Sequence, residues 1–124
     1  LRGMQQSFTR DHLWVAQLDD DKIRIGISEV LAESLGDIDE VNLPEQGEGF
    51  SIGDPFAEIG GSGGKVDLYI PVEGVISEIN ESLFDSPERL SEDPLETWLI
   101  ELEEIGEMEE LLSESEYLSS INED

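Results

Sequence analysis

Alternating apolar and polar positions predict short β-strands along most of the chain. The segments with this pattern are Leu13–Leu18, Lys22–Ile27, Ile38–Leu43, Pro55–Ile59, Val66–Ile70, Val75–Asn80 and Thr97–Leu102. Turn residues separate them, and the acidic segment 19–21 and the glycine-rich segment 60–64 each predict a hairpin. Many short strands with regularly spaced turns favour a small sandwich or barrel over a parallel α/β sheet, so we expect a mainly β fold.

Two other stretches show helical spacing. The segment Ser28–Gly36 combines a capping serine, apolar positions three and four apart and a terminal glycine, which predicts one short internal helix. The apolar residues from Met108 to Ile121 recur at similar intervals and predict an acidic C-terminal helix packed on the domain. Pro87 and Pro94 frame a loop or a further short helix.

The length of 124 residues suits one compact domain. We divide the chain into an N-terminal tail at 1–7, a β domain at 8–104 and a C-terminal helical region at 105–124, and the residues before Met4 resemble a cloning remnant. No apolar run approaches the roughly 20 residues that a membrane-spanning helix needs. We therefore expect a cytoplasmic protein without a membrane partner.

The charge is extreme, because 32 acidic and 6 basic side chains give a formal net charge of -26. Such a surface repels nucleic acid and anionic membranes, which excludes both as partners. Two interpretations remain, a basic partner surface and life in high salt. The wide spread of the acids and the presence of only two lysines, Lys22 and Lys65, favour high salt.

The sequence contains few candidate catalytic or metal-binding side chains. The absence of cysteine excludes disulfides, thiolate zinc sites and cysteine nucleophiles, and the single His12 has no obvious co-ligand, so we expect it at a strand edge near Trp14 and no metal site. The segment 60–65 is not a phosphate loop, since Val66 follows its lysine and a strand comes next. We interpret 19–21 as a solvated turn. No nucleophile, base and orienting group can be assembled, so we expect a protein that is not an enzyme.

Five aromatic residues have the spacing of core or rim positions, and we expect them in the core. They are Trp14, Phe56, Tyr69, Phe84 and Trp98.

Motifs from Phe8 to about Ile121 have the order and spacing of a known family. They are Phe8–Trp14 (aromatic-Thr-x-x-His-x-Trp), Ile25–Ser28, Leu35–Ile38, Tyr69–Gly74 (Tyr-x-Pro-Val-x-Gly), Asp85–Glu88 (Asp-Ser-Pro-Glu) and Trp98–Ile100. Taken together, the chain resembles the H protein of the glycine cleavage system.

This resemblance implies a flattened barrel-sandwich hybrid of the lipoyl-domain type. It also implies a lysine at a hairpin tip that bears lipoate and shuttles an aminomethyl group between partner enzymes. The implied partners are glycine decarboxylase, aminomethyltransferase, dihydrolipoyl dehydrogenase and the enzymes that attach lipoate. The family's lysine lies four residues before the aspartate of Asp-Leu-Tyr, and Gly63 occupies that position here.

Lys65 lies two residues beyond Gly63, about 7 Å further along a strand. A lysine displaced down the strand in a glycine-softened tip is a poor target for attachment enzymes, because such a tip favours positive φ and mobility. The first hypothesis is a divergent H-like module that acts as a non-lipoylated binding or regulatory partner. The alternative is a genuine carrier with lipoate on Lys65. The third hypothesis is that the hairpin was deliberately altered or that the protein is a purely structural scaffold, and it predicts neither modification nor binding to the three enzymes.

Overall fold

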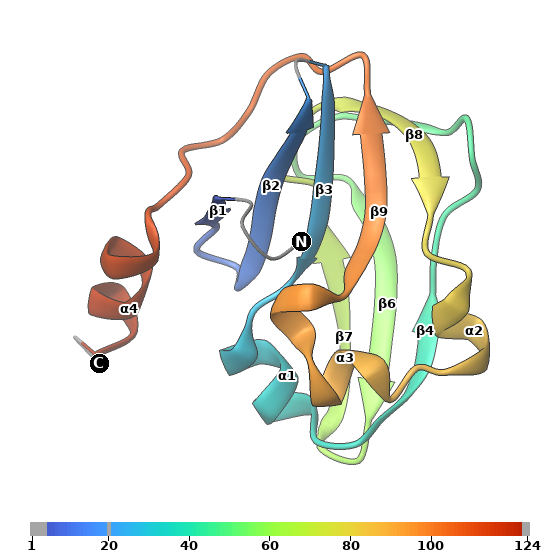
Figure 1. The fold of residues 1–124 in the computed structure, drawn as a ribbon, viewed down its shortest axis with the longest axis vertical. Helices are drawn as coiled ribbons and strands as arrows, with labels where there is room; N and C mark the ends of the chain where they lie inside the picture. The colour runs from blue at the N-terminus through green and yellow to red at the C-terminus, as the bar shows by residue number, and fades with distance from the viewer. Residues whose placement is uncertain (1–4, 20, 123–124) are drawn as a thin grey trace.

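The computed structural model describes residues 5–19 and 21–122, which form two antiparallel sheets packed face to face (Figure 1). The larger sheet has the order β1-β2-β3-β9-β8-β5, with β1 Gln6–Phe8, β2 Leu13–Asp19, β3 Lys22–Ile27, β9 Trp98–Glu103, β8 Gly74–Ile79 and β5 Gly49–Phe50. The smaller sheet has the order β4-β6-β7, with β4 Ile38–Asn42, β6 Pro55–Gly61 and β7 Gly64–Tyr69. Both predicted hairpins, β2–β3 and β6–β7, are confirmed.

The main core lies between the two sheets because each strand turns its apolar positions inward. Ile25 and Ile100 from the larger sheet and Ile59 from the smaller one are completely buried. A second cluster on the other side of the larger sheet contains Phe8, Trp14, Ala16, Leu112 and Tyr117. The mainly β sandwich architecture predicted from the alternation is confirmed.

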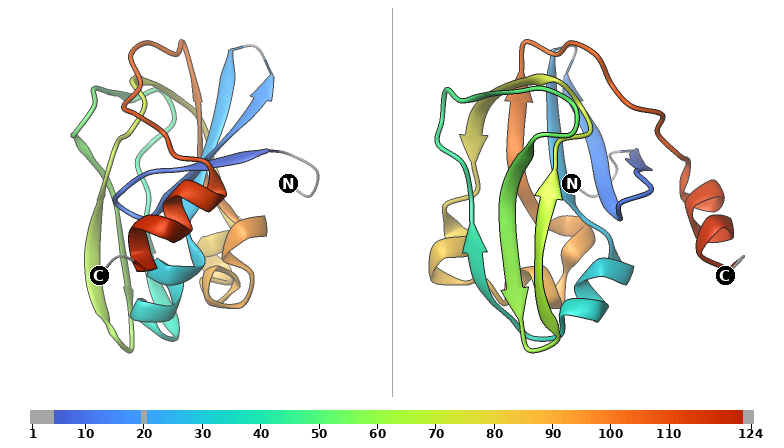
Figure 2. Two further views of the ribbon diagram at one scale, coloured as in Figure 1. Left: turned by 90° about the vertical axis from the view of Figure 1, so that its left-hand side faces the viewer. Right: turned by 180° about the vertical axis from the view of Figure 1, so that it is seen from behind.

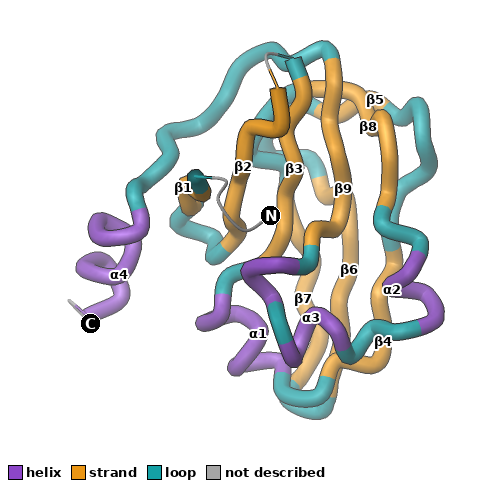
Figure 3. Tube along the Cα trace, viewed as in Figure 1, coloured by secondary structure: helices purple, strands orange, loops and turns teal. Residues whose placement is uncertain are grey.

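The internal helix α1, Glu29–Leu35, is confirmed together with its caps. The Oγ of Ser28 accepts the N–H of Leu31 at 3.2 Å, and Gly36 ends the helix with a φ of 71°. The segment between Pro87 and Pro94, where a loop or a further short helix was expected, contains a short helix. Three short elements connect β8 to β9 within the larger sheet (Figure 3): α2 Ser82–Asp85, α3 Arg89–Glu92 and the 3-10 turn η1 Pro94–Glu96. Single turns are too short to leave a helical period in the sequence.

The predicted C-terminal helix begins six residues later than its apolar spacing indicated. Helix α4 spans Glu114–Asn122, whereas Met108 and Leu112 form isolated β-bridges with Val72 and Phe8. The backbone N–H and C=O of Leu112 both bond to Phe8 at 2.7 Å. Pairing with distant backbone therefore holds this stretch extended, although its side chains have the spacing of a helix.

Part of the predicted N-terminal tail is also structured. Gln6 and Ser7 belong to β1, which pairs with β2 and places Ser7 opposite Val15. Residues 1–4, which include the suspected cloning remnant, lie outside the described residues. A strand of three residues is too short to show alternation, so only its pairing reveals it.

The expectation of five core aromatics holds in part. Trp14 and Phe56 are buried, but Tyr69 and Phe84 are 44% and 53% exposed, so their assignment to the core was wrong. Tyr69 lies on the outer face of β7, and Phe84 lies on the single-turn helix α2. Within the described residues, no helix is long and apolar enough to cross a membrane.

Candidate functional site at the β6–β7 hairpin

The position predicted for the family's lysine lies in the turn between β6 and β7, beside the C-terminal end of α1 (Figure 1). The N–H of Gly63 donates to the carbonyl oxygen of Leu35 at 2.8 Å, and the N–H of Ser62 donates to the carbonyl of Asp37 at 3.1 Å. In return, Ser62 Oγ accepts the N–H of Asp37 at 3.0 Å. The tip is therefore bonded to the connection between α1 and β4.

This docking leaves no space for a side chain at two positions of the tip, Gly61 and Gly63. A Cβ atom on Gly63 would lie 3.1 Å from the carbonyl carbon of Leu35 and still closer to the carbonyl oxygen of Ser34. A Cβ atom on Gly61 would lie 2.6 Å from the carbonyl oxygen of Asp37. Close approach of two backbones thus requires glycine here.

The φ angles of the glycines in segment 60–64 test the expectation of a soft tip. Among the glycines of segment 60–64, only Gly64 has a positive φ, of 139°. The expectation that a glycine-rich tip favours positive φ therefore holds at Gly64, whereas Gly61 and Gly63 serve the close packing of the tip against α1 and the connection to β4.

Lys65 lies on the exposed face of β7 and reaches across the smaller sheet. It pairs with Gly60 on β6, which in turn pairs with Glu40 on β4. Because Gly60 has no side chain, the Lys65 side chain crosses it, and Nζ lies 3.1 Å from Glu40 Oε2 and 3.6 Å from Glu58 Oε1. The only lysine near the tip is thus held by two carboxylates.

The charges of this cluster stabilise one another. The hydrogen bond from Lys65, helped by one of 3.0 Å from the Asn42 amide, lowers the pKa of Glu40. Reciprocally, the hydrogen bond to Glu40, its charge and the charge of Glu58 raise the pKa of Lys65. Acyl transfer to an amine needs the neutral form, so this environment makes Lys65 a weaker nucleophile.

Comparison with known proteins agrees with the sequence motifs and the two-sheet fold. The family model described as "Glycine cleavage H-protein" matches residues 6–124. The chain belongs to the glycine cleavage H-protein family. The resemblance read from the sequence motifs is therefore confirmed.

Individual members of the H-protein family are similar over nearly their whole length. A protein named "Probable glycine cleavage system H protein" from Thermococcus kodakarensis is 41% identical over 92% of this chain and 90% of its own. A glycine cleavage system H protein from Oceanobacillus iheyensis is 43% identical over 89% of each chain. The crystal structure of an H protein from Mycobacterium marinum superposes with a TM-score of 0.87 at 35% identity, covering 95% of this chain and 97% of that one.

The ion pairs of Lys65 with Glu40 and Glu58 predict how the pKa of Glu40 changes when the lysine is removed. Replacing Lys65 with Met should raise the pKa of Glu40 toward its ordinary value, as measured by carbon-detected NMR of the carboxyl group. A lowered pKa means that Glu40 contributes stability above its unfolded value of 4.5, and this contribution is lost as the pH falls through the folded value. The control is Lys22→Met on the other sheet, which should leave the pKa of Glu40 unchanged. A pKa of Glu40 that does not change in Lys65→Met would contradict the pairing.

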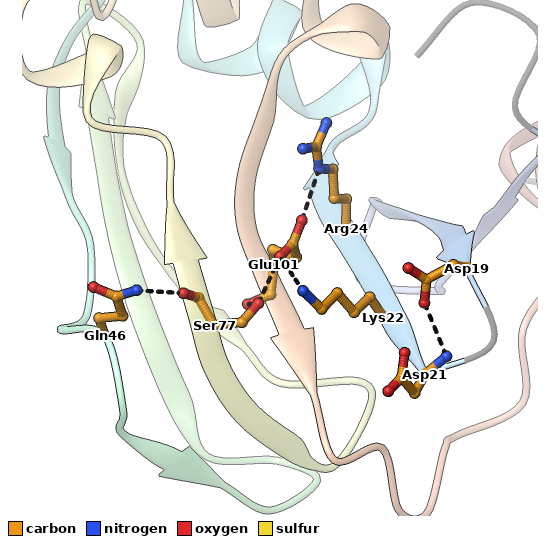
Figure 4. A network of polar contacts seen from close by, with 7 residues as sticks. All are labelled: Asp19, Asp21, Lys22, Arg24, Gln46, Ser77 and Glu101. Atoms are coloured by element: carbon orange, nitrogen blue, oxygen red, sulfur yellow. Dashed lines mark hydrogen bonds and ion pairs between the residues drawn. The ribbon is translucent and has the colours of Figure 1, made fainter.

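A second charged cluster lies on the outer face of the larger sheet (Figure 4). Glu101 is only 3% exposed, and it accepts hydrogen bonds from Ser77 Oγ at 2.7 Å and Arg24 Nε at 3.3 Å. Lys22 Nζ lies 4.0 Å away, and the Arg24 guanidinium stacks over the Trp98 ring at 4.5 Å. Three strands supply these groups, so sequence spacing alone could not reveal the cluster, and its internal pairing indicates a structural role.

His12 precedes β2, as predicted, but its partner comes from the far end of the chain. Its Nδ1 lies 2.6 Å from the hydroxyl oxygen of Tyr117, which donates to Ser28 Oγ at 2.8 Å. The Tyr117 ring stacks on Phe8 with 4.8 Å between ring centres. These contacts attach α4 to the domain and give His12 a structural environment.

The acidic turn between β2 and β3 bonds locally. The N–H of Asp21 donates to Asp19 Oδ1 at 3.1 Å (Figure 4). Among residues 5–19 and 21–122, no group of three or more His, Asp or Glu side chains is placed to hold a metal ion.

Proposed function

We propose that this chain is a divergent H-protein module that carries no lipoyl group at the family position and acts as a binding or regulatory partner. The observation that carries the proposal is the packing of Gly63 against the carbonyl groups of Ser34 and Leu35. The position has no amine, and it has no room for a side chain that could present one. The residues present at the tip therefore do not fit a lipoyl group.

Lys65 is the alternative attachment point, which would make the protein a genuine carrier of aminomethyl groups. Its ammonium is held by Glu40 and Glu58, and only half of its side chain is exposed. Attachment would need this lysine to leave both carboxylates and lose its proton. These requirements favour the non-lipoylated role.

The proposed partners are glycine decarboxylase, aminomethyltransferase, dihydrolipoyl dehydrogenase and the lipoate-attachment enzymes. A net charge of -26 favours partners with a basic docking surface.

We further propose that the chain has no catalytic activity of its own, since the charged groups described above are engaged in structural pairs. The cytoplasmic location and the exclusion of nucleic acid and membranes stay predictions.

The first test is the intact mass of the protein, with peptide mapping. It is applied to native protein and to recombinant protein incubated with lipoate ligase, ATP and lipoate, with an H protein that has a lysine at the hairpin tip as the positive control. We expect no lipoyl increment in either sample. An increment that maps to Lys65 and disappears in Lys65→Arg would replace the proposal with the carrier alternative.

The second test measures binding to the three glycine cleavage enzymes and to the lipoate ligase separately. Binding of unmodified protein to at least one of them, weakened by high salt, supports a regulatory or binding role. Absence of binding to all four, together with an unmodified Lys65, would leave the structural scaffold as the better description.

A further inference from the structure

Strand β7 is an open edge of the smaller sheet. It pairs with β6 alone, and the right-hand view of Figure 2 shows it as the outermost strand of that sheet. With six residues it is longer than the other edge strands, which have five in β4, three in β1 and two in β5. A long open edge is a template for another strand unless the protein covers or charges it.

The direction of the main-chain groups along β7 follows from Ile70, one residue beyond it. The N–H of Ile70 donates to the carbonyl of Asp54 at 2.8 Å, and its C=O accepts the N–H of Gly53 at 2.9 Å, so both face the β6 side. Alternate residues of an antiparallel strand share this direction, which leaves the main-chain groups of Lys65 and Asp67 facing outward. Within the described chain, no side chain or turn bonds to them.

Lys65 and Asp67 are both exposed, and they carry opposite charges two positions apart on one face. Val66 lies between them on the inner face, where it is partly buried against the core. Read in either direction, the sequence Lys-Val-Asp therefore presents a charge, an apolar residue and the opposite charge. An antiparallel copy of this segment complements it.

We propose that two copies of this chain pair through β7, antiparallel and centred on Val66, to form a symmetric dimer. In this register the outward main-chain groups of Lys65 exchange hydrogen bonds with those of Asp67 of the partner subunit, and the two-fold axis repeats the pair. The same register places Asp67 of the partner subunit beside Lys65 on the exposed face, where its carboxylate competes with Glu40 and Glu58 for the Lys65 ammonium. The two smaller sheets then form one continuous sheet.

The distribution of charges favours pairing through β7 over pairing through β4. The net charge determines the salt concentration at which the dimer forms. β4 carries the acids Asp39 and Glu40 and lacks a basic residue, so self-pairing there would oppose like charges. The net charge of -26 on each copy repels at long range. At about 1 M salt the screening length falls to roughly 3 Å, which removes this long-range repulsion, leaves the main-chain hydrogen bonds in place and weakens the exposed ion pairs only in part, because their charges are in contact. The dimer should therefore form at high salt and dissociate at low salt.

Sedimentation equilibrium of the full chain at low and molar salt tests the proposal. In molar salt, Lys65→Asp and Asp67→Lys should each raise the dissociation constant several-fold, because like charges replace both symmetric pairs. The double variant Lys65→Asp/Asp67→Lys restores the pairs in reverse and should dimerise like the wild type. Amide exchange at residues 65 and 67 should slow in the dimer.

A further variant separates this interface from others. Glu58→Gln releases one intramolecular partner of Lys65 and should strengthen the dimer. A wild type that stays monomeric in molar salt, or single reversals that dimerise unchanged while far-ultraviolet circular dichroism confirms their fold, would overturn the proposal. These measurements use unmodified protein, so their outcome is independent of whether Lys65 can be lipoylated.

Discussion

Replacing Gly63 with lysine should lower the free energy of unfolding by about 3 kcal/mol, although it restores the residue type that the family resemblance implies there. The added Cβ overlaps the carbonyl groups of Ser34 and Leu35, and such forced overlaps cost about 1–3 kcal/mol or more. If the tip undocks instead, the hydrogen bonds that join it to Leu35 and Asp37 are lost at about 1 kcal/mol each. Urea denaturation measures the change.

The matched controls identify the cause. Gly63→Ala should lose most of the same free energy, because the overlap begins at Cβ. Gly49→Ala places its Cβ no nearer than 4.0 Å to Val75 and should change stability by less than about 1 kcal/mol. A Gly63→Lys protein as stable as the wild type, and lipoylated at the new lysine, would show that the tip accepts a carrier lysine.

Replacing Tyr117 with Ala should detach α4 and cost about 3 kcal/mol, as truncation of a buried aromatic side chain does. The substitution removes the ring stacked on Phe8 and the hydroxyl between His12 and Ser28. Urea denaturation and amide exchange in residues 114–121 measure the two effects. Tyr117→Phe keeps the stack and should cost only about 1 kcal/mol for the lost hydrogen bonding. Equal costs for the two variants would contradict this division.

The same tyrosine predicts an alkaline pH dependence. Burial raises the pKa of Tyr117 above its ordinary value of 10.0, because the folded state disfavours the phenolate. Its contribution to stability is fully present below pH 10 and is lost as the pH rises through the folded value, since only the unfolded chain ionises readily. Stability measured from pH 9 upward should decline less steeply in Tyr117→Phe. If the stabilities of the wild type and of Tyr117→Phe declined equally with pH, groups other than Tyr117 would cause the effect.

The local sequence determined much of the architecture. Alternation from Leu13 to Ile27 defined the first hairpin, and Ser28 and Gly36 marked the ends of α1, because caps and turns depend on neighbouring residues. The motifs also identified the family, and they predict that Gly63 stands at the position of the family's lysine. The exclusion of thiol chemistry followed from composition alone.

The tertiary structure decided what these residues do. The glycine-rich segment suggested a soft tip, and only its contacts with Leu35 and Asp37 show that it is docked and that Gly61 and Gly63 have no room for a side chain. The ties of Lys65 to Glu40 and of Tyr117 to His12 join residues 25 and 105 positions apart. The spacing of Met108 and Leu112 indicated a helix, but single bridges to the distant residues Val72 and Phe8 overrode it. Short-range patterns determine elements, whereas packing between elements far apart in the chain determines which groups remain free to react.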